Sequence, residues 1–228
     1  MKNLCFDLDG TLLDYRIGEL IARLKLRKEI AELTDYPEDM IGRHYDLFWA
    51  QIKPHYWEMI DDGLTEKNIR AIHLKMVLEE AWSEEDPEEM AQLHIDTALE
   101  HMKLYPDSKQ VIEKLAEKHT LTMITNGPRD LQQLKIDKID IKHNFKEIII
   151  SGELGIHKPS KEIFNEITKR TGIPPEETVY IGNNYEKDIK GAHNAGWKTV
   201  WVNRDNEEPE ETTPDWTIKE LKELLSIF

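Results

Sequence analysis

Short apolar runs that alternate with segments of helical periodicity are the feature that most constrains this fold. The runs lie at 4–8, 121–125, 147–151, 178–182 and 199–203, and the helical segments at 108–119, 128–139, 160–171 and 185–195. The β-branched content of the runs favours strands. Alternating strands and helices, with strands apolar on both sides, predict a parallel α/β sheet covered on both faces.

The stretch 15–102 interrupts this alternation. It lacks convincing strands and has the periodicity of helices, so it predicts an all-helical insertion after the first strand. We therefore expect two domains, a core formed by 1–14 and 103–228 and a helical domain formed by 15–102.

Net charge and cysteine content limit which partners the protein can bind and in which cellular compartment we expect it. The chain has 30 Lys and Arg against 45 Asp and Glu, a formal net charge of −15, which disfavours nucleic acid and anionic membranes as partners. A single cysteine, Cys5, allows no intramolecular disulfide and fits a reducing, cytoplasmic location. We expect neither a signal peptide nor a membrane span, since no long uncharged apolar stretch occurs.

The first run ends in two carboxylates, Asp7 and Asp9, followed by the turn residue Gly10. Asp7, fixed at the strand end, can attack as a nucleophile, whereas Asp9 can protonate a leaving group and later deprotonate water. A plain turn with a surface acid is the alternative. We favour the functional interpretation because two charges beside an apolar strand require a neutralising partner.

Three later strand ends add candidate residues, which we expect at one edge of the sheet, where ligands of parallel sheets bind. Thr125 and Asn126 stand at a strand-to-helix turn suited to phosphate, and Lys158 precedes a helix and can neutralise a phosphoryl group. Asn183 and Asp188 offer oxygen ligands that, facing Asp7 and Asp9, suit Mg²⁺. Taken singly, each has an ordinary structural explanation, as a helix cap, a solvated lysine or a helix N-terminal charge.

In this order the four segments resemble the haloacid dehalogenase superfamily. The matching motifs are Asp-Leu-Asp-Gly-Thr at 7–11, Thr125 in Thr-Asn-Gly, Lys158 in Lys-Pro, and Gly182 to Asp188. The resemblance implies a Rossmann-like core, a type 1 helical cap that selects substrates, and Mg²⁺-dependent hydrolysis of a small phosphorylated metabolite through an aspartyl-phosphate on Asp7. It further implies catalytic roles for Asp7, Asp9 and Lys158, phosphate binding by Thr125, Asn126 and Lys158, and a metal held by Asp7, Asp9, Asn183 and Asp188.

One position departs from the family pattern. Phosphatases of the superfamily usually carry Asp immediately after the glycine of the fourth motif, and here Asn183 stands there. An amide oxygen still coordinates, but with one negative charge fewer we expect weaker Mg²⁺ binding.

Other functions stay open at this point. A phosphomutase would use both carboxylates, a 2-haloacid dehalogenase would not need Asp9, and a homologue that binds a phospho-ligand without turnover is compatible with Asn183. A phosphoryl-accepting signalling receiver fits less well, because its acceptor usually lies mid-chain. The sequence indicates no oligomeric state.

The insertion itself offers aromatic and histidine side chains. We interpret its scattered histidines as surface or packed residues. We expect its aromatic residues to form a packed core rather than a substrate slot; these are Tyr45, Phe48, Trp49, Tyr56 and Trp57. Tyr15 and Arg16 could reach substrate or serve as a linker.

Overall fold

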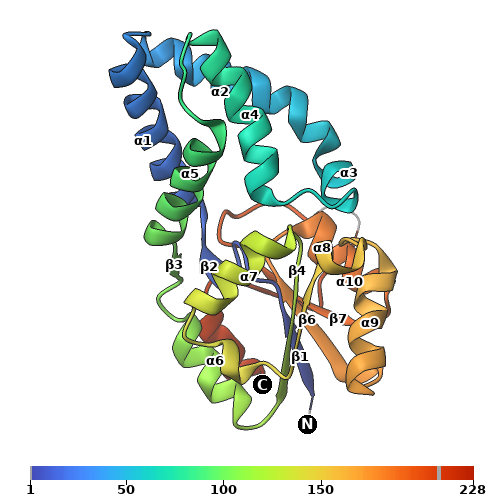
Figure 1. Cartoon of the computed structure of the whole chain (residues 1–228). Coiled ribbons are helices and arrows are strands. Elements are labelled where there is room, and N and C mark those ends of the chain that lie inside the picture. The colour runs from blue at the N-terminus through green and yellow to red at the C-terminus, as the bar shows by residue number, and fades with distance from the viewer. Residues whose placement is uncertain (1, 210–211) are drawn as a thin grey trace. The chain divides into compact units, whose positions relative to one another are not determined.

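The computed structural model describes residues 2–209 and 212–228. It divides into two compact units (Figure 1). One unit comprises Met1–Asp14 with Lys103–Phe228, and the other is Tyr15–Met102.

The first unit is built on a six-stranded parallel sheet in the order β5-β4-β1-β6-β7-β8. Its strands are β1 (Asn3–Phe6), β4 (Thr120–Thr125), β5 (Glu147–Ile150), β6 (Thr178–Gly182), β7 (Lys198–Val202) and β8 (Trp216–Ile218). In the centre, Leu4 of β1 is in register with Leu121 of β4 and Val179 of β6. The predicted parallel α/β core is therefore confirmed.

Helices follow the strands on both sides of the sheet (Figure 1). The longer ones are α6 (Ser108–Ala116), α7 (Arg129–Lys138) and α9 (Lys161–Thr171). Shorter pieces are α8 (Ser151–Leu154), α10 (Gly191–Asn194), α11 (Leu224–Ile227) and the single turns η2 (Lys142–Asn144), η3 (Pro175–Glu177) and η5 (Leu221–Glu223). A two-stranded antiparallel ribbon of β2 (Leu13–Asp14) and β3 (Lys103–Leu104) closes the unit where the chain leaves and re-enters it.

Alternation along β1 supplies both faces of the core. Cys5 joins a buried hydrophobic cluster with Tyr180 of β6, Phe164 of α9 and Trp197, which follows α10. Phe6 points to the opposite face, where its ring meets Phe145 edge-on with centroids 6.2 Å apart. Burial raises the pKa of the Cys5 thiol to about 12, so this cysteine is an inert packed residue.

The predicted elements differ from the observed ones in several ways. Strand and helix ends shift by one to three residues, and α8 was not expected. The predicted helix 185–195 begins as η4 (Tyr185–Lys190), a wider π-helical turn in which the Ile189 N–H reaches back to the Asn184 carbonyl, 3.4 Å away. Such turns inside helices are frequently found at functional sites.

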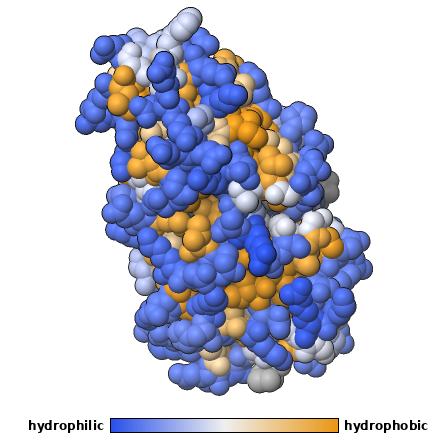
Figure 2. All heavy atoms as spheres, viewed as in Figure 1, coloured by the Kyte–Doolittle hydropathy of each residue, from blue (hydrophilic) through white to orange (hydrophobic). Residues whose placement is uncertain are grey.

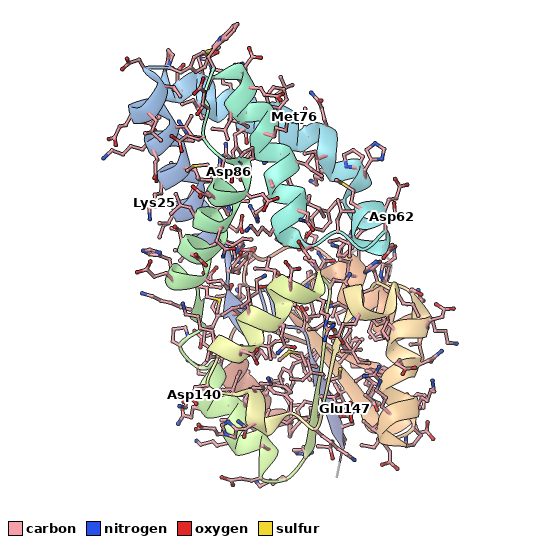
Figure 3. All side chains as sticks on the ribbon, viewed as in Figure 1. Lys25, Asp62, Met76, Asp86, Asp140 and Glu147 are labelled. Carbon is pink, nitrogen blue, oxygen red and sulfur yellow. The ribbon has the colours of Figure 1, made fainter. Side chains whose placement is uncertain are left out.

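The second unit contains only helices among its described elements. They are α1 (Arg16–Thr34), α2 (Glu38–Ile52), η1 (Lys53–His55), α3 (Tyr56–Asp61), α4 (Glu66–Glu80) and α5 (Pro87–His101). Helix α1 packs against α2 and α5, and α4 packs against the same two. The backbones of α1 and α5 approach so closely at Gly18 that a side chain there would collide with the Ala98 carbonyl, 2.2 Å away. Asp86, labelled in Figure 3, caps α5 by accepting the Glu88 N–H at 2.8 Å.

The aromatic side chains of this unit pack as predicted. Tyr45 lies in the main apolar cluster with Leu26, Ile41 and Met90. A second cluster gathers around Ile52, Ile60 and Ile69 and includes Trp49, Tyr56 and Trp57.

Hydrophobic residues reach the surface in scattered patches between hydrophilic ones (Figure 2). Most of the large exposed ones belong to the helical unit, among them Leu20 and Trp82. Among the described residues, no helix combines the length and the apolar character that a membrane crossing requires.

Candidate active site

The site is centred on the Asp7 carboxylate, which directly follows β1. The Asp7 N–H continues the sheet ladder by donating to the Ile181 carbonyl at 2.9 Å, so the backbone here is fixed. The side chain is buried, and its Oδ2 accepts the hydroxyl of Thr11 at 3.1 Å. The strand end thus places a carboxylate in a defined orientation inside the protein.

The Lys158 ammonium joins two carboxylates. Its Nζ donates to Asp7 Oδ1 and Asp188 Oδ1, both at 2.7 Å, and to the Tyr180 hydroxyl at 2.8 Å. The Lys158 side chain is 2% exposed, and charged groups at that depth require partners. The predicted neighbours Asp7, Lys158 and Asp188 are therefore brought together.

One ammonium does not neutralise two buried carboxylates. Burial raises the pKa of the Asp7 carboxyl to about 7; Lys158 opposes the shift and the Asp188 carboxylate adds to it. The attraction of both carboxylates outweighs the desolvation of Lys158 and raises its pKa. The cluster consequently carries an excess of negative charge that favours a further cation.

Asn126 positions Lys158 by a reciprocal pair of hydrogen bonds. Its Nδ2 donates to the Lys158 carbonyl and its Oδ1 accepts the Lys158 N–H, both at 2.9 Å. The side-chain amide thereby holds the loop that carries the lysine. The phosphate contact that the sequence predicts for Asn126 stays a prediction. Neighbouring Thr125 is fully buried at the end of β4.

Asn183 and Asp188 reach the site from the end of β6. Asn183 Oδ1 lies 3.0 Å from Thr11 Oγ1, the same hydroxyl that donates to Asp7. Gly10, at φ +84°, lets the first turn pack on this amide, because a Cβ there would lie 2.6 Å from Asn183 Nδ2. Asp188 is held by the Asn184 N–H, which donates to Oδ2 at 2.9 Å.

The available donors fit Mg²⁺. Within residues 2–209 and 212–228, no three His, Cys, Asp or Glu side chains are arranged to hold a metal ion. Asp7 and Asp188 instead offer two carboxylates, and Asn183 adds an amide oxygen beside them. Mg²⁺ prefers oxygen ligands and keeps several waters, so it needs only one or two carboxylates.

The Asp9 carboxylate contacts α7 rather than Lys158. Lys135 Nζ donates to Asp9 Oδ1 at 3.1 Å and to Oδ2 at 3.0 Å, and Gln132 Nε2 donates to Oδ2 at 3.0 Å. The Asp9 side chain therefore forms an ion pair with α7. The metal contact that the sequence predicts for Asp9 stays a prediction.

The sequence pattern assigns no site role to four residues that contact the predicted ones. They are Thr11, the last residue of the first motif, and Gln132, Lys135 and Tyr180. Gln132 and Lys135 stand three positions apart and so share one face of α7, which was a signal available in the sequence. Tyr180 was visible only as one member of an apolar run.

The fold and this site define an α/β protein with a Rossmann-like parallel sheet and a buried aspartate at the end of its first strand. Residues 1–196 match the family model of the haloacid dehalogenase-like hydrolases, and the chain belongs to that family.

Individual relatives extend this result over the whole chain. A phosphoserine phosphatase from Thermus thermophilus is 30% identical over 99% of this chain and 98% of its own length. Among solved structures, the magnesium-bound HAD-hydrolase YfnB from Bacillus subtilis is similar with a TM-score of 0.74 and 27% identity, over 99% of this chain and 97% of that one. A 2-haloacid dehalogenase from Pseudomonas syringae pv. Tomato reaches a TM-score of 0.73 at 25% identity, over 100% and 97%.

Proposed function

We propose that this hydrolase cleaves phosphomonoesters of small metabolites with bound Mg²⁺, through an aspartyl-phosphate on Asp7. The carrying observation is the buried Asp7 carboxylate, which Lys158 and Thr11 hold at the end of β1. Its fixed orientation suits in-line attack on phosphorus. The phosphatase name of the Thermus relative also supports this reaction class.

In the first step an oxygen of Asp7 attacks phosphorus and the bond from phosphorus to the ester oxygen breaks. The departing oxygen keeps the electron pair and takes a proton from Asp9, two residues further along the turn. Lys158 and the Thr125 hydroxyl stabilise the charge on the other phosphoryl oxygens.

In the second step a water molecule gives a proton to Asp9 while its oxygen attacks phosphorus. The bond between phosphorus and Asp7 breaks, its electron pair returns to the carboxylate, and inorganic phosphate leaves. Asp9 is then protonated again for the next cycle, so one side chain serves as acid and base in turn.

Asp7, Asp188 and Asn183 would hold the metal ion, which when bound neutralises negative charge on the phosphoryl group. Lys135 engages both oxygens of Asp9, so we leave that side chain out of the metal ligands and assign it to proton transfer on its place two residues after Asp7. Under this proposal the helical unit Tyr15–Met102 acts as the cap that selects substrates, since the motif residues all lie outside it. The enzyme would work in the cytoplasm on a small phosphorylated metabolite.

A dehalogenase is the second candidate, because a relative of that name has a closely similar structure. Halide leaves without a proton, so a dehalogenase has no need for a carboxylate at Asp9. The partly exposed Asp9 side chain, 32% accessible, therefore favours the phosphatase. A phosphomutase would share the first step and differ in its product.

The deciding experiment compares Asp7→Asn with the wild type. We expect the wild type to release phosphate from phosphorylated metabolites and from p-nitrophenyl phosphate only with Mg²⁺, and Asp7→Asn to lose turnover while remaining folded. Asp137→Asn, on the exposed side of α7, is the matched control and should retain activity. Multiple turnover by pure Asp7→Asn would refute the proposal, and transfer of the phosphoryl group to a second hydroxyl would indicate a mutase.

A further inference from the structure

Lys135 is a lysine buried on a helix. Its side chain is only 4% exposed, and Gln132, three residues earlier on α7, is 1% exposed. Two positions on such a face would ordinarily carry apolar residues, because burying an ammonium and an amide costs free energy unless both are bonded. Their partners therefore indicate what they are for.

Both side chains converge on Asp9. The ammonium bonds both carboxylate oxygens, at 3.1 and 3.0 Å, and the Gln132 amide bonds the second oxygen at 3.0 Å. Asp9 itself follows the end of β1 and has only an isolated bridge to Leu13, so no regular strand pairing orients it. Its carboxylate direction is set by α7.

Gln132 also contacts the phosphate side of the site. The same Nε2 that bonds Asp9 donates to the Thr125 hydroxyl and lies 3.4 Å from the Asn126 carbonyl. The Gln132 amide thus lies between the Asp9 carboxylate and the end of β4, where phosphate is proposed to bind.

We propose that Lys135 and Gln132 are positioning residues that hold Asp9 where its proton transfers take place. This inference rests on the proposed function, since it assumes that Asp9 serves as acid and base. Proton transfer requires the carboxylate within hydrogen-bond reach of the reacting oxygen, and such catalysis is worth about 10²- to 10⁴-fold in rate. We call the contacts of Lys135 and Gln132 with Asp9 the clamp. Its loss should therefore slow both proton-dependent steps and leave phosphate binding intact.

The main variant is Lys135→Met, which keeps the length and apolar stem of the side chain. With alkyl phosphates we expect kcat to fall on the order of 100-fold at nearly unchanged KM. With p-nitrophenyl phosphate, whose leaving group barely needs a proton, the first step should stay fast while the second slows. The variant should then release p-nitrophenol in a burst of about one equivalent, followed by slow turnover.

Three comparisons distinguish a positioning role of Lys135 from a general loss of folding or activity in the variant. Lys135→Arg keeps the donors and should recover most of kcat. Lys138→Met, at an exposed position on the same helix, should behave as the wild type. In an Asp9→Asn background, Lys135→Met should cause little further loss, because the group that it positions is already gone.

The inference would be overturned if Lys135→Met slowed the p-nitrophenol burst as much as it slows the turnover of alkyl phosphates. An unchanged kcat, or full additivity with Asp9→Asn, would overturn it as well. A wild type without phosphatase activity would instead sink the proposed function. In that case the clamp is still tested by a double-mutant cycle on thermal unfolding, in which Lys135→Met and Asp9→Asn should be non-additive; additivity there would overturn the clamp independently of any reaction.

Discussion

Replacing Lys158 by Met should strongly destabilise the metal-free core unit. The ammonium lies within 2.7 Å of both Asp7 and Asp188, and the lysine side chain is 2% exposed. Removing one partner of a buried ion pair typically costs about 3–5 kcal/mol, because the remaining charge stays buried and uncompensated. Here two carboxylates would remain, so we expect a loss of about that size.

The loss should depend on pH in a defined direction. With Lys158 present, the pKa of Asp7 is already raised from 3.8 to about 7, and without the ammonium it should rise further. The folded state then binds a proton that the unfolded state releases above pH 3.8, so stability falls as pH rises through this window. The deficit of Lys158→Met should therefore be larger at pH 8 than at pH 5.

Urea unfolding in the presence of a chelator measures both effects. Lys138→Met, at an exposed position, is the control for removing a lysine and should change the free energy of unfolding by less than about 0.5 kcal/mol. Adding Asp188→Asn to Lys158→Met should restore stability at pH 8, because it removes one of the two opposed carboxylates. A double variant less stable than Lys158→Met, or a deficit independent of pH, would refute this account of the cluster.

Two further predictions concern the metal position and the helical unit. Asn183→Asp should lower the half-saturating Mg²⁺ concentration, since it adds a charged oxygen next to Thr11 and the carboxylates. It should also lower the metal-free stability by about 1–3 kcal/mol. An unchanged or higher half-saturating concentration would show that residue 183 does not bind the ion. Burial, with a contribution from Arg70, lowers the pKa of His73 from 6.5 to about 4, and its Nε2 donates to the Tyr45 carbonyl at 2.8 Å. The unfolded state therefore binds the proton first, and stability should fall by about 3 kcal/mol as pH drops from about 6.5 to 4. Urea unfolding at several pH values should show a weaker dependence of stability on pH for His73→Gln than for the wild type. An equal dependence in both proteins would contradict the role given to His73.

The sequence by itself determined the α/β core and the sheet edge to which the reactive residues belong. Strands show as apolar runs because both faces of a parallel sheet are buried, and helices show by their apolar period. Asp7, Lys158 and Asp188 could be assigned to one edge because the carboxyl ends of parallel strands meet there. These inferences need only local patterns and the rule of strand direction.

The tertiary structure decided which atoms each of these side chains contacts. The pattern around Asp9 contains nothing that points to Lys135, which lies 126 positions away and bonds it only because α7 packs beside the first turn. The pattern at Asn126 predicts a phosphate ligand, and only the tertiary structure shows its side-chain amide bonded to the N–H and the carbonyl of Lys158.

The π-helical start at Tyr185 is likewise not indicated by the periodicity, which predicts a regular helix over 185–195. There Asp188 is held by the Asn184 N–H and by Lys158 together. Side-chain direction in a turn depends on rotamers and on partners distant in sequence, and a local pattern of residue types records neither. The sequence therefore identifies the edge of the sheet that carries the site, whereas packing determines which side chains contact one another there.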